Sequence, residues 1–350
     1  MEYTYKFPVV RGIQAGREYY IAMVPLRMIS KLFPDEDEIL LPEYRAQRRL
    51  NKDRIPVISK YITENRESYV FSALAASIDG QYKFIEGADK MGTGVLEVSM
   101  DSKFLINDGQ HRKAAIIDAL KEDSSLGNET ISVVFFEDKG LNRSQQMFTD
   151  LNKHALKTSN SISELYDSRD PLAVATKNAI LQNSFLDEYT DKEKDNLGKY
   201  SSKLFTLNLF YKANKRIVGR TKITEYEEKF LVDFWAAVVK NMEPWNELVN
   251  HEISKKDLRE NYIAVQGVVI QALGRIGEFI YQNELKISEE MKKLKGINWK
   301  RNAQEWKNRT IRQDGRIIAN ETAIILTGNK LKSRFGIPLS EEEKEKEKTI

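Results

Sequence analysis

Residues 104–120 read FLINDGQHRKAAIIDAL, and within them an apolar strand pattern changes into a helical pattern. The apolar residues 104–106 predict a buried strand, whereas the residues from 112 onward have the spacing of an amphipathic helix. The junction consists of Asn107, Asp108, Gly109, Gln110 and His111, with Arg112 at the start of the helical pattern. A glycine at such a junction lets the backbone turn tightly. The stretch therefore predicts a strand-to-helix turn in a protein that mixes α and β structure.

The same turn offers donors to an anion. The first amides of a helix have no partners within the helix, and together with the helix dipole they favour negative charge at that end. Gln110, His111 and Arg112 would add side-chain donors, and the planar guanidinium of Arg112 suits a phosphate group. Alternatively, Asn107 or Asp108 caps the helix and no ligand is involved. Residue types and spacing alone leave both interpretations open.

The rest of the chain divides into two parts of different pattern. Residues 1–168 carry alternating apolar stretches and helical segments, which predict a mixed sheet with inserted helices, so the fold class is α/β (α+β). Residues 169–338 carry mainly helical periodicity, with Thr224 and Ser288 as expected N-caps, and predict a helical domain. Trp299 and Trp306 lie seven residues apart and are expected to face inward on one helix. The strongly charged residues 339–350 are expected to be a disordered tail.

Positive charge is concentrated in two segments, although the net charge of the chain is only +3. Residues 196–224 contain seven cations and no Asp or Glu, and residues 292–334 contain twelve Lys or Arg against three acidic residues. Such clusters indicate anionic partners, and double-stranded DNA is the first candidate. The predicted phosphate contacts of the first segment are Lys199, Lys203, Lys212, Lys215, Arg216, Arg220 and Lys222.

Several classes of site lack the residues that they need. The chain has no cysteine, which excludes disulfides and thiolate chemistry, and its three histidines are too scattered to predict a metal site. It has no phosphate loop of the Gly-x4-Gly-Lys-Ser/Thr type and no stretch of about 18 apolar residues that would span a membrane. The N-terminal residues also lack the pattern of a secretion signal, so we expect a cytoplasmic protein without membrane contact.

The pentapeptide DGQHR at residues 108–112, preceded by an apolar strand and followed by KAAI, resembles the signature of the DGQHR-domain proteins. The best-known members of that group are the DndB proteins of bacterial DNA phosphorothioation systems. Other segments agree in order, among them QRRLNKDRIPVISKYI, YVFSALAASIDG and MFTDLNKHALKTSNSISELYD. The similarity extends from about residue 7 to residue 340.

This resemblance implies a core like that of ParB and sulfiredoxin proteins, in which the corresponding turn holds nucleotide phosphates. It adds Arg48 and Asn152 to residues 108–112 as phosphate-binding candidates. ParB-like proteins carry a Gly-Glu-Arg-Arg type of sequence here, whereas this chain has Gln110 and His111 before the arginine. The difference is compatible with a bound nucleoside triphosphate and speaks against its hydrolysis.

The resemblance also implies a function, namely a DNA-binding transcriptional regulator that represses a phosphorothioation (dnd) gene cluster. Such a regulator would act as a homo-oligomer, because symmetric DNA sites are read by at least a dimer. The alternative is a ParB-like nucleoside triphosphatase or DNA-nicking enzyme in which Asp108 or His111 is the catalytic acid or base. A third possibility is an assembly subunit that binds other components of the modification system without binding DNA.

Overall fold

The protein is described here by a computed structural model that covers residues 3–34, 50–88, 90–137, 146–147, 149–151, 158–219 and 223–350. The chain divides into two compact units, residues 1–156 and residues 157–350. The division lies twelve residues before the position expected from the sequence. Unit 1 contains a mixed sheet with helices and unit 2 is mainly helical, so the α/β prediction is confirmed.

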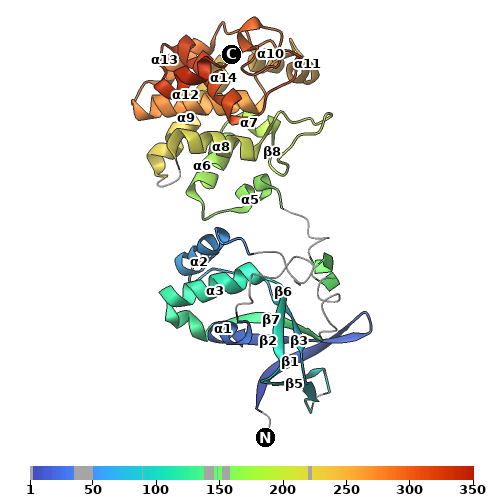
Figure 1. Cartoon of the computed structure of the whole chain (residues 1–350). Coiled ribbons are helices and arrows are strands. Elements are labelled where there is room, and N and C mark those ends of the chain that lie inside the picture. Colours follow the sequence, from blue (N-terminus) through green and yellow to red (C-terminus); the bar gives the residue numbers. More distant parts are fainter. Residues whose placement is uncertain are drawn as a thin grey trace. The chain divides into compact units, whose positions relative to one another are not determined.

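Unit 1 is built on a seven-stranded sheet in the order β4-β5-β1-β2-β7-β3-β6 (Figure 1). The strands are β1 (Thr4–Gln14), β2 (Arg17–Pro25), β3 (Leu74–Asp79), β4 (Tyr82–Glu86), β5 (Thr93–Ser99), β6 (Lys103–Asp108) and β7 (Thr130–Glu137). Neighbouring strands are antiparallel except β3 and β7, which run parallel. In β1 and β2 buried and exposed residues alternate, as expected for a sheet with one face on a core.

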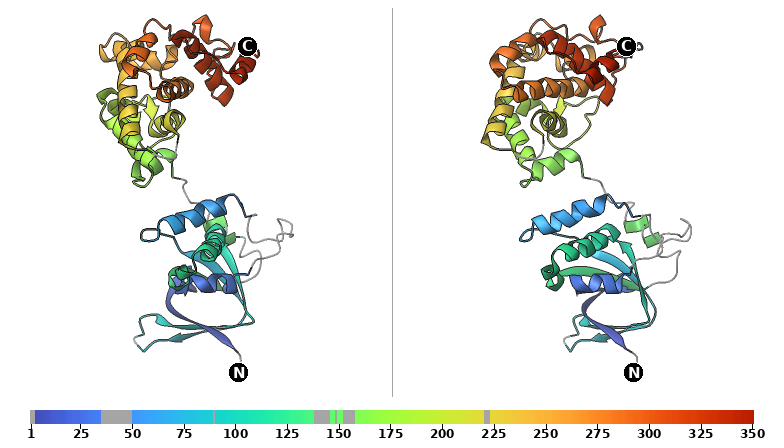
Figure 2. Two further views of the ribbon diagram at one scale, coloured as in Figure 1. Left: turned by 90° about the vertical axis from the view of Figure 1, so that its left-hand side faces the viewer. Right: turned by 60° about the vertical axis from the view of Figure 1, so that its left-hand side comes forward.

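Helices cover one face of this sheet (Figure 2). They are η1 (Leu26–Met28), α1 (Ile29–Leu32), α2 (Arg54–Glu64), α3 (Gln110–Glu122) and η3 (Ser124–Asn128). Ile62 of α2 and Ile116 of α3 pack in one core with Phe7, Val24 and Val133 of the sheet. The turn at residues 108–110 thus joins an edge strand, β6, to a helix that is anchored on the sheet.

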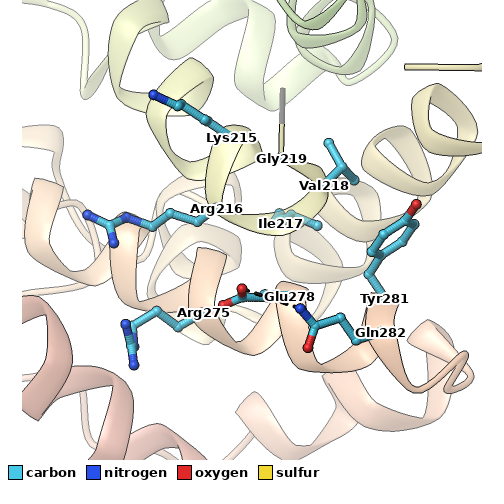
Figure 3. A pocket seen from close by; sticks show the side chains of 9 residues that line it. All are labelled: Lys215, Arg216, Ile217, Val218, Gly219, Arg275, Glu278, Tyr281 and Gln282. Carbon is cyan, nitrogen blue, oxygen red and sulfur yellow. Dashed lines mark hydrogen bonds between the residues drawn. The ribbon is translucent and has the colours of Figure 1, made fainter. Parts of the chain in front are cut away.

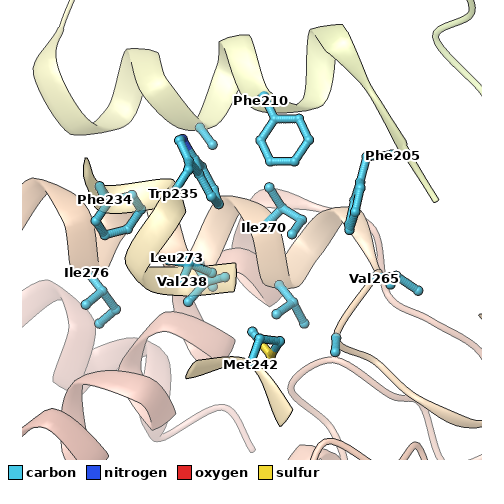
Figure 4. Packing of buried hydrophobic residues seen from close by; sticks show 14 of the residues in the cluster. Phe205, Phe210, Phe234, Trp235, Val238, Met242, Val265, Ile270, Leu273 and Ile276 are labelled. Carbon is cyan, nitrogen blue, oxygen red and sulfur yellow. The ribbon is translucent and has the colours of Figure 1, made fainter. Parts of the chain in front are cut away.

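Unit 2 packs most of its helices around an aromatic core. It contains α5 (Asn160–Tyr166), α6 (Pro171–Leu181), α7 (Ser184–Tyr189), β8 (Thr190–Asp191), β9 (Phe205–Thr206), α8 (Leu207–Val218), α9 (Glu225–Asn241), α10 (Glu243–Val249), α11 (Lys255–Asn261), α12 (Gly267–Gln282), α13 (Ile287–Glu290), η4 (Met291–Leu294), η5 (Gln304–Trp306), α14 (Glu321–Phe335) and α15 (Glu341–Glu347). Phe205, Phe210, Phe234 and Trp235 lie together between α8, α9 and α12 (Figure 4).

Two local predictions for unit 2 need correction. Trp299 and Trp306 are buried and stack with their ring centroids 5.6 Å apart, but Trp299 precedes η5 and does not share a helix with Trp306. Thr224 caps α9 and forms a capping box, as predicted. Ser288 does not cap a helix, because α13 begins at Ile287 with Lys286 as its N-cap.

The C-terminal residues also differ from the expectation of disorder. Residues 341–347 form α15, which begins with a capping box between Ser340 and Glu343. The sequence contained this signal, since a serine followed by a glutamate three residues later is typical of a helix start. Glu343 is buried, so the helix is held against the rest of unit 2.

Candidate functional site

Gly109 determines the shape of the turn between β6 and α3. Its φ angle is +102°, a backbone conformation that side chains other than hydrogen rarely allow. A Cβ atom at this position would lie 2.4 Å from Cδ2 of Leu74. The glycine is therefore required both by the backbone conformation and by the close approach of β3.

Asn107, directly before this turn, forms a bulge in the pairing of β6 with β3. Its buried amide nitrogen donates to the Ser77 hydroxyl at 2.6 Å and contacts the Met147 sulfur at 3.1 Å. Its carbonyl oxygen has no hydrogen-bond partner among the residues that the structure describes. The side chain does not cap α3, so the prediction of Asn107 as a helix cap is wrong.

Arg112 ties the turn to the segment that leads into β3. Its Nη1 donates to the carbonyl oxygens of Ser72 at 2.9 Å and Ala73 at 3.0 Å, and also to the Ser72 hydroxyl. Its Nη2 donates to the carboxylate of Asp108 at 2.7 Å, so Asp108 forms an ion pair and does not cap the helix either. The Arg112 side chain is only 17% exposed. In this arrangement both side chains stabilise the turn, and an anion would compete with Asp108 for the guanidinium.

His111 joins the start of α3 to the segment that precedes α2. Its Nε2 accepts a hydrogen bond from the backbone N–H of Asn51 at 3.0 Å, and an accepting nitrogen carries no proton. Asn51 itself accepts from the amide of Asp53, next to the first turn of α2. Gln110 is half-buried in the first turn of α3. The geometry of this corner thus rests on side chains that link three segments of unit 1.

The structure brings together only part of the predicted phosphate site. Residues 108–112 lie in one turn, whereas Arg48 and Asn152 are outside the residues that the structure describes. Arg220 and Lys222 of the basic segment are also outside the described residues.

Lys212 and Lys215 form the exposed basic face of α8 in unit 2. They lie three residues apart, so they are neighbours on the helix surface. Neither ammonium forms an ion pair with a carboxylate among the described residues. Both cations are therefore available to a phosphate backbone.

Arg216 and Lys203 of this segment have partners within the unit, whereas Lys199 is exposed and has no acidic partner among the described residues. Arg216 forms a bidentate pair with Glu321, at 2.8 and 2.7 Å, and its Nε donates to Gln271 at 2.8 Å. Lys203 donates to the backbone carbonyl of Glu188. The carboxylate that neutralises Arg216 lies 105 residues away, outside the segment, so the composition of the segment does not reveal this pair.

A cavity of about 460 Å³ lies beside the C-terminal end of α8 (Figure 3). Lys215 and Arg216 line it from α8, and Arg275 and Tyr281 line it from α12. Arg275 is paired with Glu343, which leaves Lys215 as the cation of this lining without an acidic partner in the described part of the chain.

The second basic segment is less cationic at its surface than its composition indicates. Six of its twelve cations pair with acidic residues, namely Lys292, Lys293, Arg309, Arg316, Lys330 and Lys332. Arg301 donates instead to the carbonyls of Glu260 and Gly315. Half of the cations in this segment are therefore paired with acids within unit 2.

Glu343 of α15 is the acid that the sequence analysis missed. Burial alone would raise its pKa, but hydrogen bonds from Lys332, from the Ser340 amide and from Arg275 outweigh burial and lower the pKa to about 2. The Lys332 and Arg275 contacts are 2.6 and 2.5 Å long. Glu347, one turn later, pairs with Arg309 at 2.6 Å.

The described residues offer neither a metal site nor a membrane-spanning helix. They contain no group of three or more acidic or histidine side chains that could hold a metal ion. Within the same residues no helix has both the length and the apolar character needed to cross a membrane.

Comparison with protein-family models identifies a family for this chain. The model of a family described as DndB, DNA-sulfur modification-associated, matches residues 7–338. No curated protein and no solved structure matches the chain.

Proposed function

The chain belongs to the DndB family of DNA-sulfur modification-associated proteins, and from that premise we propose that it is a DNA-binding transcriptional regulator. In this proposal it represses a phosphorothioation (dnd) gene cluster. It binds double-stranded DNA as a homo-oligomer, and enzymatic activity is the alternative function. The observation that carries the proposal is the pair of exposed, unpaired cations Lys212 and Lys215 on α8.

The basic face of α8 fits a phosphate backbone better than a small ligand. Two ammonium groups one helical turn apart can neutralise successive phosphates, and such contacts release counterions and make binding depend on salt. Arg216 lies on the same helix but is held by Glu321, which positions α8 against α14. Some cations of this segment thus stabilise the fold, whereas Lys212 and Lys215 are available to bind DNA.

The test is a salt series of fluorescence anisotropy titrations with a labelled duplex from the upstream region of the gene cluster, compared with a shuffled duplex. Replacing both Lys212 and Lys215 by Gln should lower the slope of log K against log salt by roughly 2, since each phosphate contact contributes about 0.9. Lys229→Gln is the matched control, because Lys229 is exposed but paired with Asp233 at 3.0 Å. Equal affinity for both duplexes would refute the proposal that the protein is a repressor. An unchanged slope would show that α8 is not part of the DNA interface.

The enzyme alternative has less support from the geometry of the turn. Asp108 and Arg112, its candidate acid and charge stabiliser, are paired with each other, and His111 accepts from a backbone amide. Incubation with each nucleoside triphosphate tests the alternative directly, with His111→Ala and Arg112→Ala as comparisons. Turnover that is lost in both variants would favour an enzyme over a regulator.

A further inference from the structure

The loop of residues 192–204 connects β8 to β9 in unit 2 (Figure 1). Its base is closed by the parallel pairing of Thr190 with Phe205, and by a hydrogen bond from the Leu204 amide to the Tyr189 carbonyl at 2.8 Å. The loop therefore leaves and re-enters the fold at one fixed place.

Arg259 of α11 holds the tip of this loop. Its guanidinium donates to three backbone carbonyls, those of Gly198 at 2.9 Å, Lys199 at 3.2 Å and Ser201 at 2.9 Å. A further bond runs from the Ser201 amide to the Gly198 carbonyl at 3.0 Å. Ordering a loop costs backbone entropy, and this tip buries no large apolar side chain in return. The hydrogen bonds of Arg259 to the carbonyls of Gly198, Lys199 and Ser201, which we call the clamp, fix the loop in a defined shape.

The side chain that the clamp presents is Tyr200. It is 91% exposed, more than any other large hydrophobic side chain in the described part of the chain, whereas Phe205 and Phe210 nearby in sequence are buried. The carbonyls on both sides of Tyr200 are held by Arg259, so the ring is offered to solvent on a fixed backbone. A tyrosine has few rotatable bonds and provides a large contact surface at low entropic cost.

One cation lies beside the ring. The ammonium of Lys199 lies 5.7 Å from the centroid of the Tyr200 ring. Asp195, an acid of the same loop, is turned inward and accepts from the backbone amides of Asn160 and Ser161. An exposed ring beside a cation, with this nearby acid withdrawn, is the combination that proteins use to bind unpaired nucleobases, where the ring stacks and the cation meets the phosphate.

We propose that Tyr200 is a stacking contact for an unpaired base of DNA, with Lys199 on the adjacent phosphate. The inference rests on the proposed DNA-binding function and adds to it a preference for single-stranded or locally opened DNA at this loop. A closed duplex offers no free base face, so the contact is specific to opened DNA. Arg259 is a positioning residue in this arrangement, because it touches the loop backbone and not the base.

The experiment is an anisotropy titration of the full chain with a labelled oligo-dT single strand and with a duplex of equal length. Tyr200→Ala should weaken single-strand binding by about 5- to 150-fold, which corresponds to a stacking energy of about 1–3 kcal/mol per base, and change duplex binding less than twofold. Tyr200→Phe should retain the affinity, because it keeps the ring. Tyr166→Ala is the control, since Tyr166 is 76% exposed but lies at the end of α5 outside the loop.

Quenching of 2-aminopurine placed in the single strand provides a second readout that a merely structural role of Tyr200 would not change. It should be seen with the wild-type protein and with Tyr200→Phe, and be lost in Tyr200→Ala. Arg259→Lys should give an intermediate affinity, because it keeps the charge but loses the fork that holds three carbonyls.

The outcomes separate this inference from the proposed function. If Tyr200→Ala binds single strands like the wild type while the Lys212 and Lys215 variant weakens duplex binding, the stacking contact is refuted and the DNA-binding function remains. An equal loss on both kinds of DNA also refutes it, because the contact would then not be with unpaired bases. If the wild type binds neither kind of DNA, both proposals fail.

Discussion

Replacing Glu343 by Gln tests whether α15 is an integral part of unit 2. The carboxylate is buried, with 5% of the side chain exposed, and it bonds to both Arg275 and Lys332. Glutamine has nearly the same shape and can still accept from the Ser340 amide, which bonds to the second carboxylate oxygen at 2.9 Å. The substitution therefore removes the charge and leaves the two cations without their partner.

The lowered pKa of Glu343 gives the size of the expected loss of folding stability. A fall from 4.5 to about 2 corresponds to roughly 3 kcal/mol of stabilisation of the charged form in the folded state. Removing one partner of a buried ion pair costs about 3–5 kcal/mol in other proteins, which is of the same order. Because the folded-state pKa is below that of the unfolded chain, this stability is present above pH 4.5 and is lost as the pH falls towards 2.

Urea unfolding followed by tryptophan fluorescence is a suitable assay, because all four tryptophans of the chain, at positions 235, 245, 299 and 306, belong to unit 2. At pH 7 the midpoint for Glu343→Gln should fall by roughly 1–1.5 M urea, given a slope of about 2–3 kcal/mol per M. Glu341→Gln is the control, since its carboxylate is 88% exposed and its pair with Lys344 should contribute little.

Two results would contradict this reasoning. If Glu343→Gln unfolds within about 0.5 kcal/mol of the wild type at pH 7, the buried ion pairs do not stabilise the unit. If the difference between variant and wild type persists unchanged at pH 2, it does not come from the charge of Glu343.

The turn at residues 108–112 supports further predictions about unit 1. Gly109→Ala should destabilise it by about 1–3 kcal/mol in thermal unfolding followed by circular dichroism, and more than Gly16→Ala, which has a positive φ but open space around it. Equal effects of the two alanines would show that contact with Leu74 is unimportant. Arg112→Met should cost about 2–4 kcal/mol in the same assay, because it leaves the Ser72 carbonyl and Asp108 without their donor. A stable Arg112→Met protein would instead favour a role of this arginine in binding a ligand.

The strand-to-helix turn could be predicted from the sequence because its signals are local. Apolar periodicity located β6 and α3, and Gly109 marked the place where the backbone must turn. The hydrogen-bond partners of the polar residues in this turn could not be predicted, because these partners lie far away in sequence. Arg112 bonds to Ser72, 40 residues earlier, and no spacing rule connects the two.

The same distinction applies to the basic segments. Composition identified where the cations are concentrated, but the acid that pairs with Arg216 lies on α14. The helix of the tail had a local signal, Ser340 followed by Glu343, which the high charge of residues 339–350 obscured. Trp299 and Trp306 were correctly predicted to be buried, whereas their arrangement depends on an irregular segment that periodicity does not describe.

The placement of α15 has a consequence for the electric field of unit 2. Glu343 and Glu347 hold Arg275, Lys332 and Arg309 by direct contact, so these carboxylates occupy positions that phosphate oxygens could otherwise take. A chain shortened before Ser340 would expose those three cations and become more positive by the loss of five glutamates and three lysines. The shortened chain would be less stable and would attract polyanions more strongly. The short helix α15 therefore increases the stability of unit 2 and weakens its positive field.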